Sequence, residues 1–290
     1  MFWLQQIFNG ITQGSIYALM AIGYSIILGI IGLVTFVHGE VIMIGAFAGF
    51  FMVTFLKANF FLAVLAGFAA SWLLGIIIER VCYRPFRSGP REIALIATIG
   101  LSILLRSLSQ VTFGTEQKLM PDLLNSHFIP LGQIRITNIQ LLIIFTVFIL
   151  ALLLHQFFYK TKTGIALRAV SMNKQAAALL GVHVNRTILL GNALGCALGG
   201  VSGVLLGIYY NSVHPVMGAS VAMKAFTATV FGGIGSIPGA ALGGILLGIF
   251  ENLGVAIFSS GYRDIISFSI LILILLIRPQ GILGRKELER

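Results

Sequence analysis

The sequence predicts an all-α polytopic membrane protein with about eight or nine transmembrane helices, some broken or re-entrant. Of its 290 residues, 58% are hydrophobic and 10% are charged, whereas a soluble domain carries about 25% charged residues. Apolar runs of about 20 residues recur along the chain, and that is the length a helix needs to cross a bilayer. The ~10-residue alternation of a membrane β-barrel is absent. The apolar surface must therefore face lipid.

Four spans are expected in the first part of the chain. The N-terminus, "MFWLQQIFNG", lacks a basic segment and a small-residue cleavage site, so it is expected to begin the first helix. The run 8–56 is too long for one span, and Gly29, Gly32 and Gly39 offer the break between two helices. The expected spans here are 8–30, 36–56, 59–79 and 93–113.

Five further candidate spans follow an external segment. Span 218–236 is rich in glycine and is expected to be interrupted, and span 263–278 is short for a crossing. The other candidates are 138–159, 188–209 and 239–258.

Basic residues set the orientation of the spans. Segment 79–92 carries four arginines, and segment 160–186 carries five lysines or arginines and no acid. Both segments, with the tail after Arg278, are expected on the cytoplasmic side, and 114–137 is then external. The net charge of +10 is explained in the same way and does not indicate nucleic-acid binding. We therefore expect a single transmembrane domain over 1–290, with a cytoplasmic loop at 160–187.

Glycines repeat every fourth residue in span 188–209, which makes one helix face nearly bare backbone. Small residues let helices approach closely inside a bilayer, where the hydrophobic effect does not drive them together. These glycines are expected to pack helices: Gly191, Gly195, Gly199, Gly203 and Gly207.

Ionisable residues inside spans are costly and are candidate functional groups by default. Lys224 and Glu251 lie within expected spans. They could form an ion pair that satisfies both, or they could face a polar translocation path. Arg106 could simply extend to the membrane surface. All of these alternatives remain open on the sequence.

His38, Gly39 and Glu40 interrupt an apolar run at the expected break. One interpretation is a cytoplasmic turn, with Glu40 favourably placed at the N-terminus of the next helix. The other is a broken helix lining the translocation path, as transporters use for substrate binding. Segments 32–51 and 211–231 share a histidine before a Met-containing apolar helix, which is compatible with a faint internal repeat.

Motifs for catalysis are absent from the sequence. It contains no GxxxxGK[ST], so ATP hydrolysis by this chain is not expected, and no HExxH or GxSxG. The five histidines show no metal-ligand spacing. The chain is therefore not expected to be an enzyme or to hold a cofactor or metal. A purely structural scaffold would leave the intramembrane charges unexplained.

Segment 163–186 is too polar to span and is expected to form a short helix, a glycine turn and a second helix along the membrane surface. Its "QAAALLG" resembles the E-A-A-x3-G loop by which ABC importer permeases dock into their ATPase. Gln175 stands where that pattern has an acid, and Gly191 where an apolar residue is common. The residues that the resemblance assigns to ATPase coupling are Arg168, Asn173, Lys174, Gln175, Ala176, Ala177, Leu180 and Gly181.

Other stretches resemble one family along the whole chain, the permease subunits of bacterial branched-chain amino acid ABC importers. The similar segments are "NGITQGSIYALMAIGYSIILGIIGLVTFVHGEVIMIGAF" (9–47), "IERVCYRPFRS" (78–88), "MKAFTATVFGGIGSIPGA" (223–240) and "RPQGILGRKE" (278–287). Thr35 stands where the family commonly has Asn. Segment 9–47 includes the family's H-G-E.

The resemblance implies a multi-pass permease of the bacterial inner membrane that transports Leu, Ile and Val. ATP would be bound by two cytoplasmic ATPase subunits, and a second homologous permease and a periplasmic binding protein would complete the importer. Segment 114–137 would be periplasmic. The candidate substrate pathway is His38, Gly39, Glu40, Lys224 and Glu251. The alternatives are the same importer class for urea, short amides or other neutral amino acids, and an ion-coupled secondary transporter.

Overall fold

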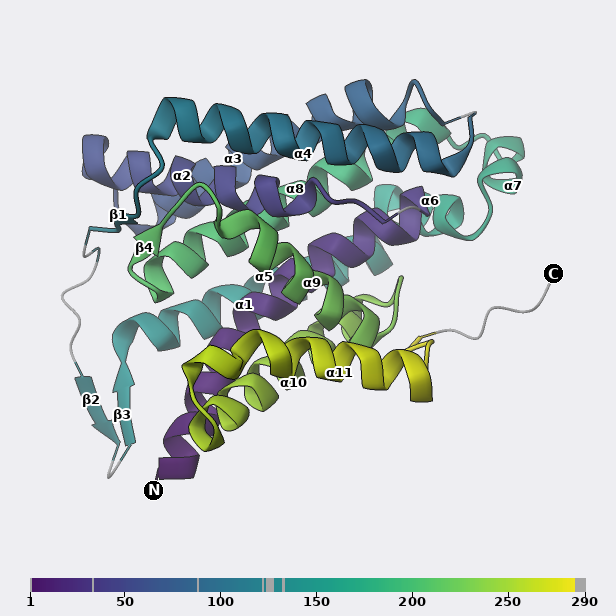
Figure 1. Cartoon of the computed structure of the whole chain (residues 1–290). Coiled ribbons are helices and arrows are strands. Elements are labelled where there is room, and N and C mark those ends of the chain that lie inside the picture. Colours follow the sequence, from purple (N-terminus) through teal and green to yellow (C-terminus); the bar gives the residue numbers. More distant parts are fainter. Residues whose placement is uncertain are drawn as a thin grey trace. The chain divides into compact units, whose positions relative to one another are not determined.

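The structure is a computed structural model that describes residues 2–32, 34–87, 89–121, 123, 128–131 and 134–284. The chain is almost wholly helical (Figure 1). Its contacts form two compact units. Unit 1 comprises Met1–Ser25, Leu124–Ala151 and Met223–Arg290, and unit 2 comprises Ile26–Leu123 and Leu152–Ala222. Helices α1, α5 and α9 each contribute residues to both units.

Within the described residues, eight helical segments are long and apolar enough to cross a membrane, which confirms the expected class. The helices are α1 (Phe2–Ile31), α2 (His38–Leu56), α3 (Phe60–Ile78) with the π-helix η1 (Glu79–Tyr83), α4 (Arg91–Phe113), α5 (Asn138–Lys160), α6 (Lys162–Met172), α7 (Lys174–Leu179), α8 (Val184–Tyr209), α9 (Met217–Gly232), α10 (Ile237–Ile257), the 3-10 turn η2 (Ser260–Tyr262) and α11 (Arg263–Ile277).

Among the described residues, four short strands lie between the helices. β1 (Lys118–Leu119) pairs antiparallel with β4 (Ser212–Val213), and β2 (Phe128–Leu131) pairs antiparallel with β3 (Ile134–Thr137). On the side of β3, the backbone of Arg135 exchanges two hydrogen bonds with the side chain of Gln5, so the start of α1 is fastened to this hairpin.

Span 218–236 is shorter than expected. Helix α9 has 16 residues and ends at Gly232, and α10 starts at Ile237. Ser236 caps α10 by accepting a hydrogen bond from the amide of Gly239, and a proline follows in the first turn, which is a strong helix start. The expected interruption therefore occurs, but it separates α9 from α10 and does not divide α9.

Helix α8 packs against α2 and α3 through glycines at the centre of unit 2. A methyl group on Gly45 of α2 would overlap the backbone of Gly200, and one on Gly200 would overlap Ser71 of α3. The glycines that repeat along α8 also face neighbours: Gly191 faces Ile30 and Leu167, Gly199 faces His38, Gly203 faces Ile42, and Gly207 faces Val213, while Gly195 is buried in the same helix. Van der Waals contact between backbones therefore holds this unit together.

In unit 1, the N-terminal part of α1 also packs against α10 through glycines. A methyl group on Gly244 would overlap the backbone of Ala18, and one on Gly248 would overlap Gly14. The Thr229 hydroxyl donates to the carbonyl of Ala21, which adds α9 to the pair.

A non-helical turn separates α1 from α2. Helix α1 ends at Ile31, and Gly32 has a φ of +78°, a left-handed conformation that favours glycine. Helix α2 then starts at His38 and is continuous to Leu56. The break that the sequence predicts is therefore present, and it precedes the second helix and does not interrupt it.

The start of α2 lies deep beside α8. Ile30 lies against Gly191, whereas His38 lies against Gly199, about 12 Å farther along α8 at 1.5 Å per residue. His38 is thus about 22 Å from the start of α8 at Val184, in a bilayer core about 30 Å thick. A turn therefore follows α1, and the continuous helix α2 begins beside Gly199, past the middle of α8.

The segment after α5 contains two short helices before α8, so it has one helix boundary more than the sequence predicts. Helices α6 and α7 meet at Asn173, whose side chain accepts hydrogen bonds from the amides of Gln175 and Ala176 and so caps α7. Gly181, with φ +83°, makes the expected glycine turn, which separates the short helix α7 from α8.

Candidate functional site

Glu40 is a buried carboxylate in the first turn of α2, and α4 satisfies its charge. Its Oε1 accepts hydrogen bonds from Arg106 Nη2 at 2.6 Å and Nε at 3.2 Å, and from Ser102 Oγ at 3.0 Å. The Glu40 side chain is 1% exposed and that of Arg106 is 33% exposed. Arg106 therefore does not simply extend to the membrane surface. Its guanidinium ties α4 to the start of α2.

Two helix starts meet at Glu40. A methyl group on Gly39 would overlap the carbonyl oxygen of Gly218, in the first turn of α9. Glu40 Oε2 lies 3.1 Å from the position of a Cβ on Gly218, and it accepts no hydrogen bond from the described residues. Helix N-termini carry partial positive charge, so the Glu40 carboxylate complements both α2 and α9. The two segments of the faint repeat, 32–51 and 211–231, are thus in contact through Gly39 and Gly218.

His38 is fully buried, and its imidazole packs against the backbone of α8. A Cβ on Gly199 would lie 2.9 Å from His38 Cε1 and 3.2 Å from Nε2. The ring therefore occupies the space that Gly199 leaves, and it fixes the start of α2 at this depth.

Glu251 of α10 is the centre of a second buried polar cluster, within unit 1. Its Oε1 accepts from Lys224 Nζ at 3.0 Å, which is the ion pair that the sequence left open. Lys224 also contacts Asp264 Oδ1 at 3.1 Å. Further donors to the Glu251 carboxylate come from α1 and α11: Gln13 Nε2 at 3.2 Å, Tyr17 OH at 3.3 Å, Arg263 Nε at 3.3 Å and Ser267 Oγ at 3.3 Å. The cluster joins four helices and contains two cations and two carboxylates.

Several members of this cluster did not stand out in the sequence. Gln13 and Tyr17 are four residues apart on α1, and so are Arg263 and Ser267 on α11, so each pair shares one helix face. That spacing of polar residues could have indicated a polar face on each of the two apolar helices. In the described part of the chain, no group of three or more His, Cys, Asp or Glu could hold a metal ion.

The residues that resemble a coupling loop differ in exposure. Ala177 is 2% exposed and packs inward, whereas Leu179 is 90% exposed and Leu180 is 82% exposed. Met172, at the end of α6, is 75% exposed. The side chains that a partner could contact include the polar Lys174 and Gln175 and the apolar residues at the ends of α6 and α7. A bulky substitution at Ala177 would disturb the fold of the loop itself.

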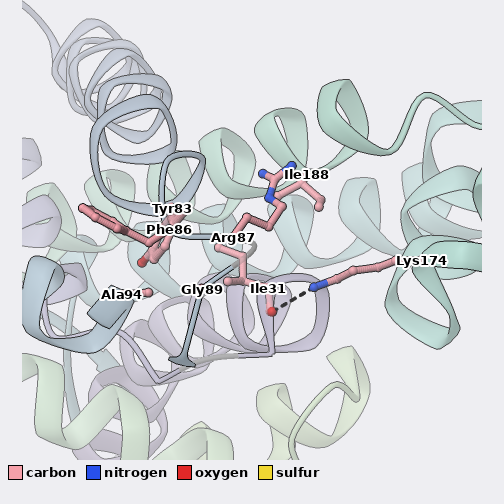
Figure 2. A pocket seen from close by; sticks show the side chains of 8 residues that line it. All are labelled: Ile31, Tyr83, Phe86, Arg87, Gly89, Ala94, Lys174 and Ile188. Atoms are coloured by element: carbon pink, nitrogen blue, oxygen red, sulfur yellow. Dashed lines mark hydrogen bonds between the residues drawn. The ribbon is translucent and has the colours of Figure 1, made fainter. Parts of the chain in front are cut away.

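Lys174 links α7 to the end of α1. Figure 2 shows its side chain reaching to the backbone oxygen of Ile31, and Nζ donates a hydrogen bond to that oxygen at 3.1 Å. Both residues line a cavity of about 230 Å³ that Tyr83, Phe86 and Arg87 also line. The contact is one residue from Gly32, where the chain turns toward α2.

Comparisons with known proteins cover the whole chain. The family model described as "Branched-chain amino acid transport system / permease component" matches residues 6–275. The chain is 44% identical to the high-affinity branched-chain amino acid transport system permease protein LivH of Escherichia coli K12, over 100% of this chain and 98% of that protein. It is 43% identical to BraD of Pseudomonas aeruginosa, of the same description, over 99% and 98%.

A solved structure shows the same fold at low identity. It is described as PsaBC from Streptococcus pneumoniae in complex with Fab, with a TM-score of 0.53 and 16% identity over 97% of this chain and 93% of that chain. The family model and the full-length relatives establish the assignment: the chain belongs to the family of branched-chain amino acid transport permeases.

Proposed function

We propose that this chain is the membrane-spanning subunit of an ABC importer that moves leucine, isoleucine and valine across the bacterial inner membrane. The observation that carries the proposal is the end-to-end match to LivH and BraD, both described as high-affinity branched-chain amino acid transport permeases. The eight apolar helices provide the membrane span.

Partner subunits supply the energy and the substrate in this proposal. The sequence has no phosphate-binding loop, so ATP is bound and hydrolysed by two cytoplasmic ATPase subunits. A second, homologous permease completes the membrane part, and a periplasmic binding protein delivers the amino acid.

The ATPase docks on the loop formed by α6 and α7. Exposed apolar side chains on a short polar segment are typical of a contact surface, and Met172, Leu179 and Leu180 provide them. Movement of α7 would pull on Ile31 through Lys174. Because Ile31 immediately precedes the turn at Gly32, this contact offers a direct route from the ATPase to the start of α2.

The buried charges border the path of the substrate. Ionisable groups inside transmembrane segments are costly and mark substrate and ion pathways. The start of α2 contains His38, Gly39 and Glu40, and Glu40 forms an ion pair with Arg106. A second ion pair, between Lys224 and Glu251, lies in unit 1. An amino acid carries both charges at neutral pH, and each of the two clusters contains groups of both signs.

Substrate competition in a reconstituted importer tests the proposal. The permease is incorporated into vesicles with candidate ATPases, a second permease and a binding protein, and ATP-dependent uptake of labelled leucine is measured. Excess isoleucine or valine should compete strongly, whereas urea, short amides and other neutral amino acids should not. Uptake of urea or of another neutral amino acid in preference to leucine would contradict the substrate assignment.

A further inference from the structure

A basic groove lies where α3 and α8 reach the same end of unit 2. It has a volume of about 430 Å³ and lies between η1, which continues α3, and the first turns of α8. The spans that contain these elements end at Tyr83 and begin at Val184, so the groove is at the level of a membrane surface. Its lining is Glu79, Arg80, Arg84, Asn185, Arg186, Leu189 and Leu190.

Three guanidinium groups of this groove have no acidic partner among the described residues. Arg80, Arg84 and Arg186 are all exposed. The one carboxylate in the lining, Glu79, is 1% exposed and already forms an ion pair with Arg87. The groove therefore presents three positive charges that the described protein does not neutralise.

Hydrogen bonds between η1 and α8 hold the wall of the groove together. Arg87 donates to both Glu79 and Asn185, which joins η1 to the start of α8. The wide turn of η1 is closed by a hydrogen bond from the Arg84 amide to the Glu79 carbonyl at 2.8 Å. This turn places Arg80 and Arg84 at the same end of α3, beside Arg186.

An apolar helix face continues from the arginines along α3. Leu73 and Ile77 are 61% and 53% exposed, and with Arg80 and Arg84 they follow a spacing of four, three and four residues, which is one helix face. Leu190 adds exposed apolar surface from α8. A ligand that fits both surfaces has an anionic head and an apolar body.

We propose that this groove binds the headgroup of an anionic phospholipid, with its acyl chains along Leu73 and Ile77. Arginine forks match phosphate oxygens bidentately, and basic pockets between transmembrane helix ends bind anionic headgroups. An acidic protein surface would complement the three arginines, but it would leave the adjoining apolar face without a partner. The three arginines and the apolar face would bind such a lipid whatever substrate the protein transports.

Native mass spectrometry of the detergent-purified protein tests this site. Phosphatidylglycerol and phosphatidylcholine with the same acyl chains are titrated separately, and inorganic phosphate is then added to the phosphatidylglycerol complex. The test variant carries Arg80→Gln, Arg84→Gln and Arg186→Gln. The matched control carries Lys160→Gln, Lys162→Gln and Arg278→Gln, which removes the same charge from other exposed sites. We expect the test variant to bind the first phosphatidylglycerol at least tenfold more weakly, while the control variant binds as the wild type does.

A second variant guards against a folding defect. The triple substitution of Arg80, Arg84 and Arg186 to Lys keeps the charge and should retain more binding than the Gln variant. Equal losses in the test and control variants would overturn the proposal, because they would show general charge attraction. Equal affinity for both lipids, or full displacement by inorganic phosphate, would also overturn it. So would unchanged lipid binding with lost ATPase assembly, which would assign the groove to a protein partner.

Discussion

Replacing Glu251 by Gln should destabilise unit 1 more than any single exposed charge change. Glu251 is fully buried, and its Oε1 is shared by Lys224 at 3.0 Å and Arg263 at 3.3 Å. Removing one partner of a buried ion pair costs about 3–5 kcal/mol, because the remaining charge stays desolvated. We expect the lower end, about 3 kcal/mol, because Lys224 keeps Asp264 at 3.1 Å.

A double-mutant cycle separates the ion pair from the rest of the cluster. Lys224→Met alone leaves Glu251 its Arg263 contact, so it should cost less than Glu251→Gln. The double variant should lose at least about 1 kcal/mol less stability than the sum of the two single variants. Each single variant leaves one buried charge without its partner, whereas the double variant removes both charges. Glu116→Gln is the matched control, because Glu116 is exposed and should change stability by less than about 0.5 kcal/mol.

Thermal unfolding in detergent, followed as the loss of helical circular dichroism, measures these changes, because both units are helical. A loss of about 3 kcal/mol corresponds to a fall in Tm of about 6–12 °C at the scale of soluble domains. An unchanged Tm for Glu251→Gln, or additive effects in the cycle, would refute the reasoning.

Four further outcomes are expected. Gly45→Ala should lower stability by about 1–3 kcal/mol in the same unfolding assay, because its methyl group would overlap the α8 backbone. Gly100→Ala, which meets nothing within 4 Å, should not lower it. Leu180→Asp should abolish co-purification with the ATPases without changing Tm. Glu40→Gln should reduce ATP-dependent leucine uptake at least tenfold with the subunits still assembled, and normal uptake would remove the carboxylate from the mechanism. Burial lowers the pKa of His214, so the folded protein should lose stability as the pH falls below about 6.5, and His214→Gln should abolish that loss in unfolding curves at pH 5 and pH 8.

The helices could be predicted from the sequence because a bilayer demands long apolar runs. The ends of α4 and α5 fell within two residues of the expected spans. The break before α2 was foreseen because residues 8–56 exceed one span and contain Gly32. The glycine turn at Gly181 could be predicted and separates the short helix α7 from α8. The additional boundary between α6 and α7 was not predicted, although Asn173 is a residue type that favours the start of a helix.

The partners of the buried charges were harder to predict. Glu40 and Arg106 are 66 residues apart, and Gln13 and Glu251 are 238 apart. Pairings of that kind are set by the packing of helices through glycines, which one sequence does not specify. The Lys224–Glu251 pair could be anticipated only as one of two alternatives, because a residue at membrane depth needs a partner but does not identify it.

A measurement of which energy source drives transport tests the central claim most directly. The complete importer is reconstituted in sealed vesicles, and leucine uptake is measured with and without ATP on the side of the ATPase subunits, in the presence and absence of proton and sodium gradients. An ABC importer permease should accumulate leucine only with ATP, and the gradients should not change the rate. Uptake by the permease alone, driven by an ion gradient without ATP, would contradict the account.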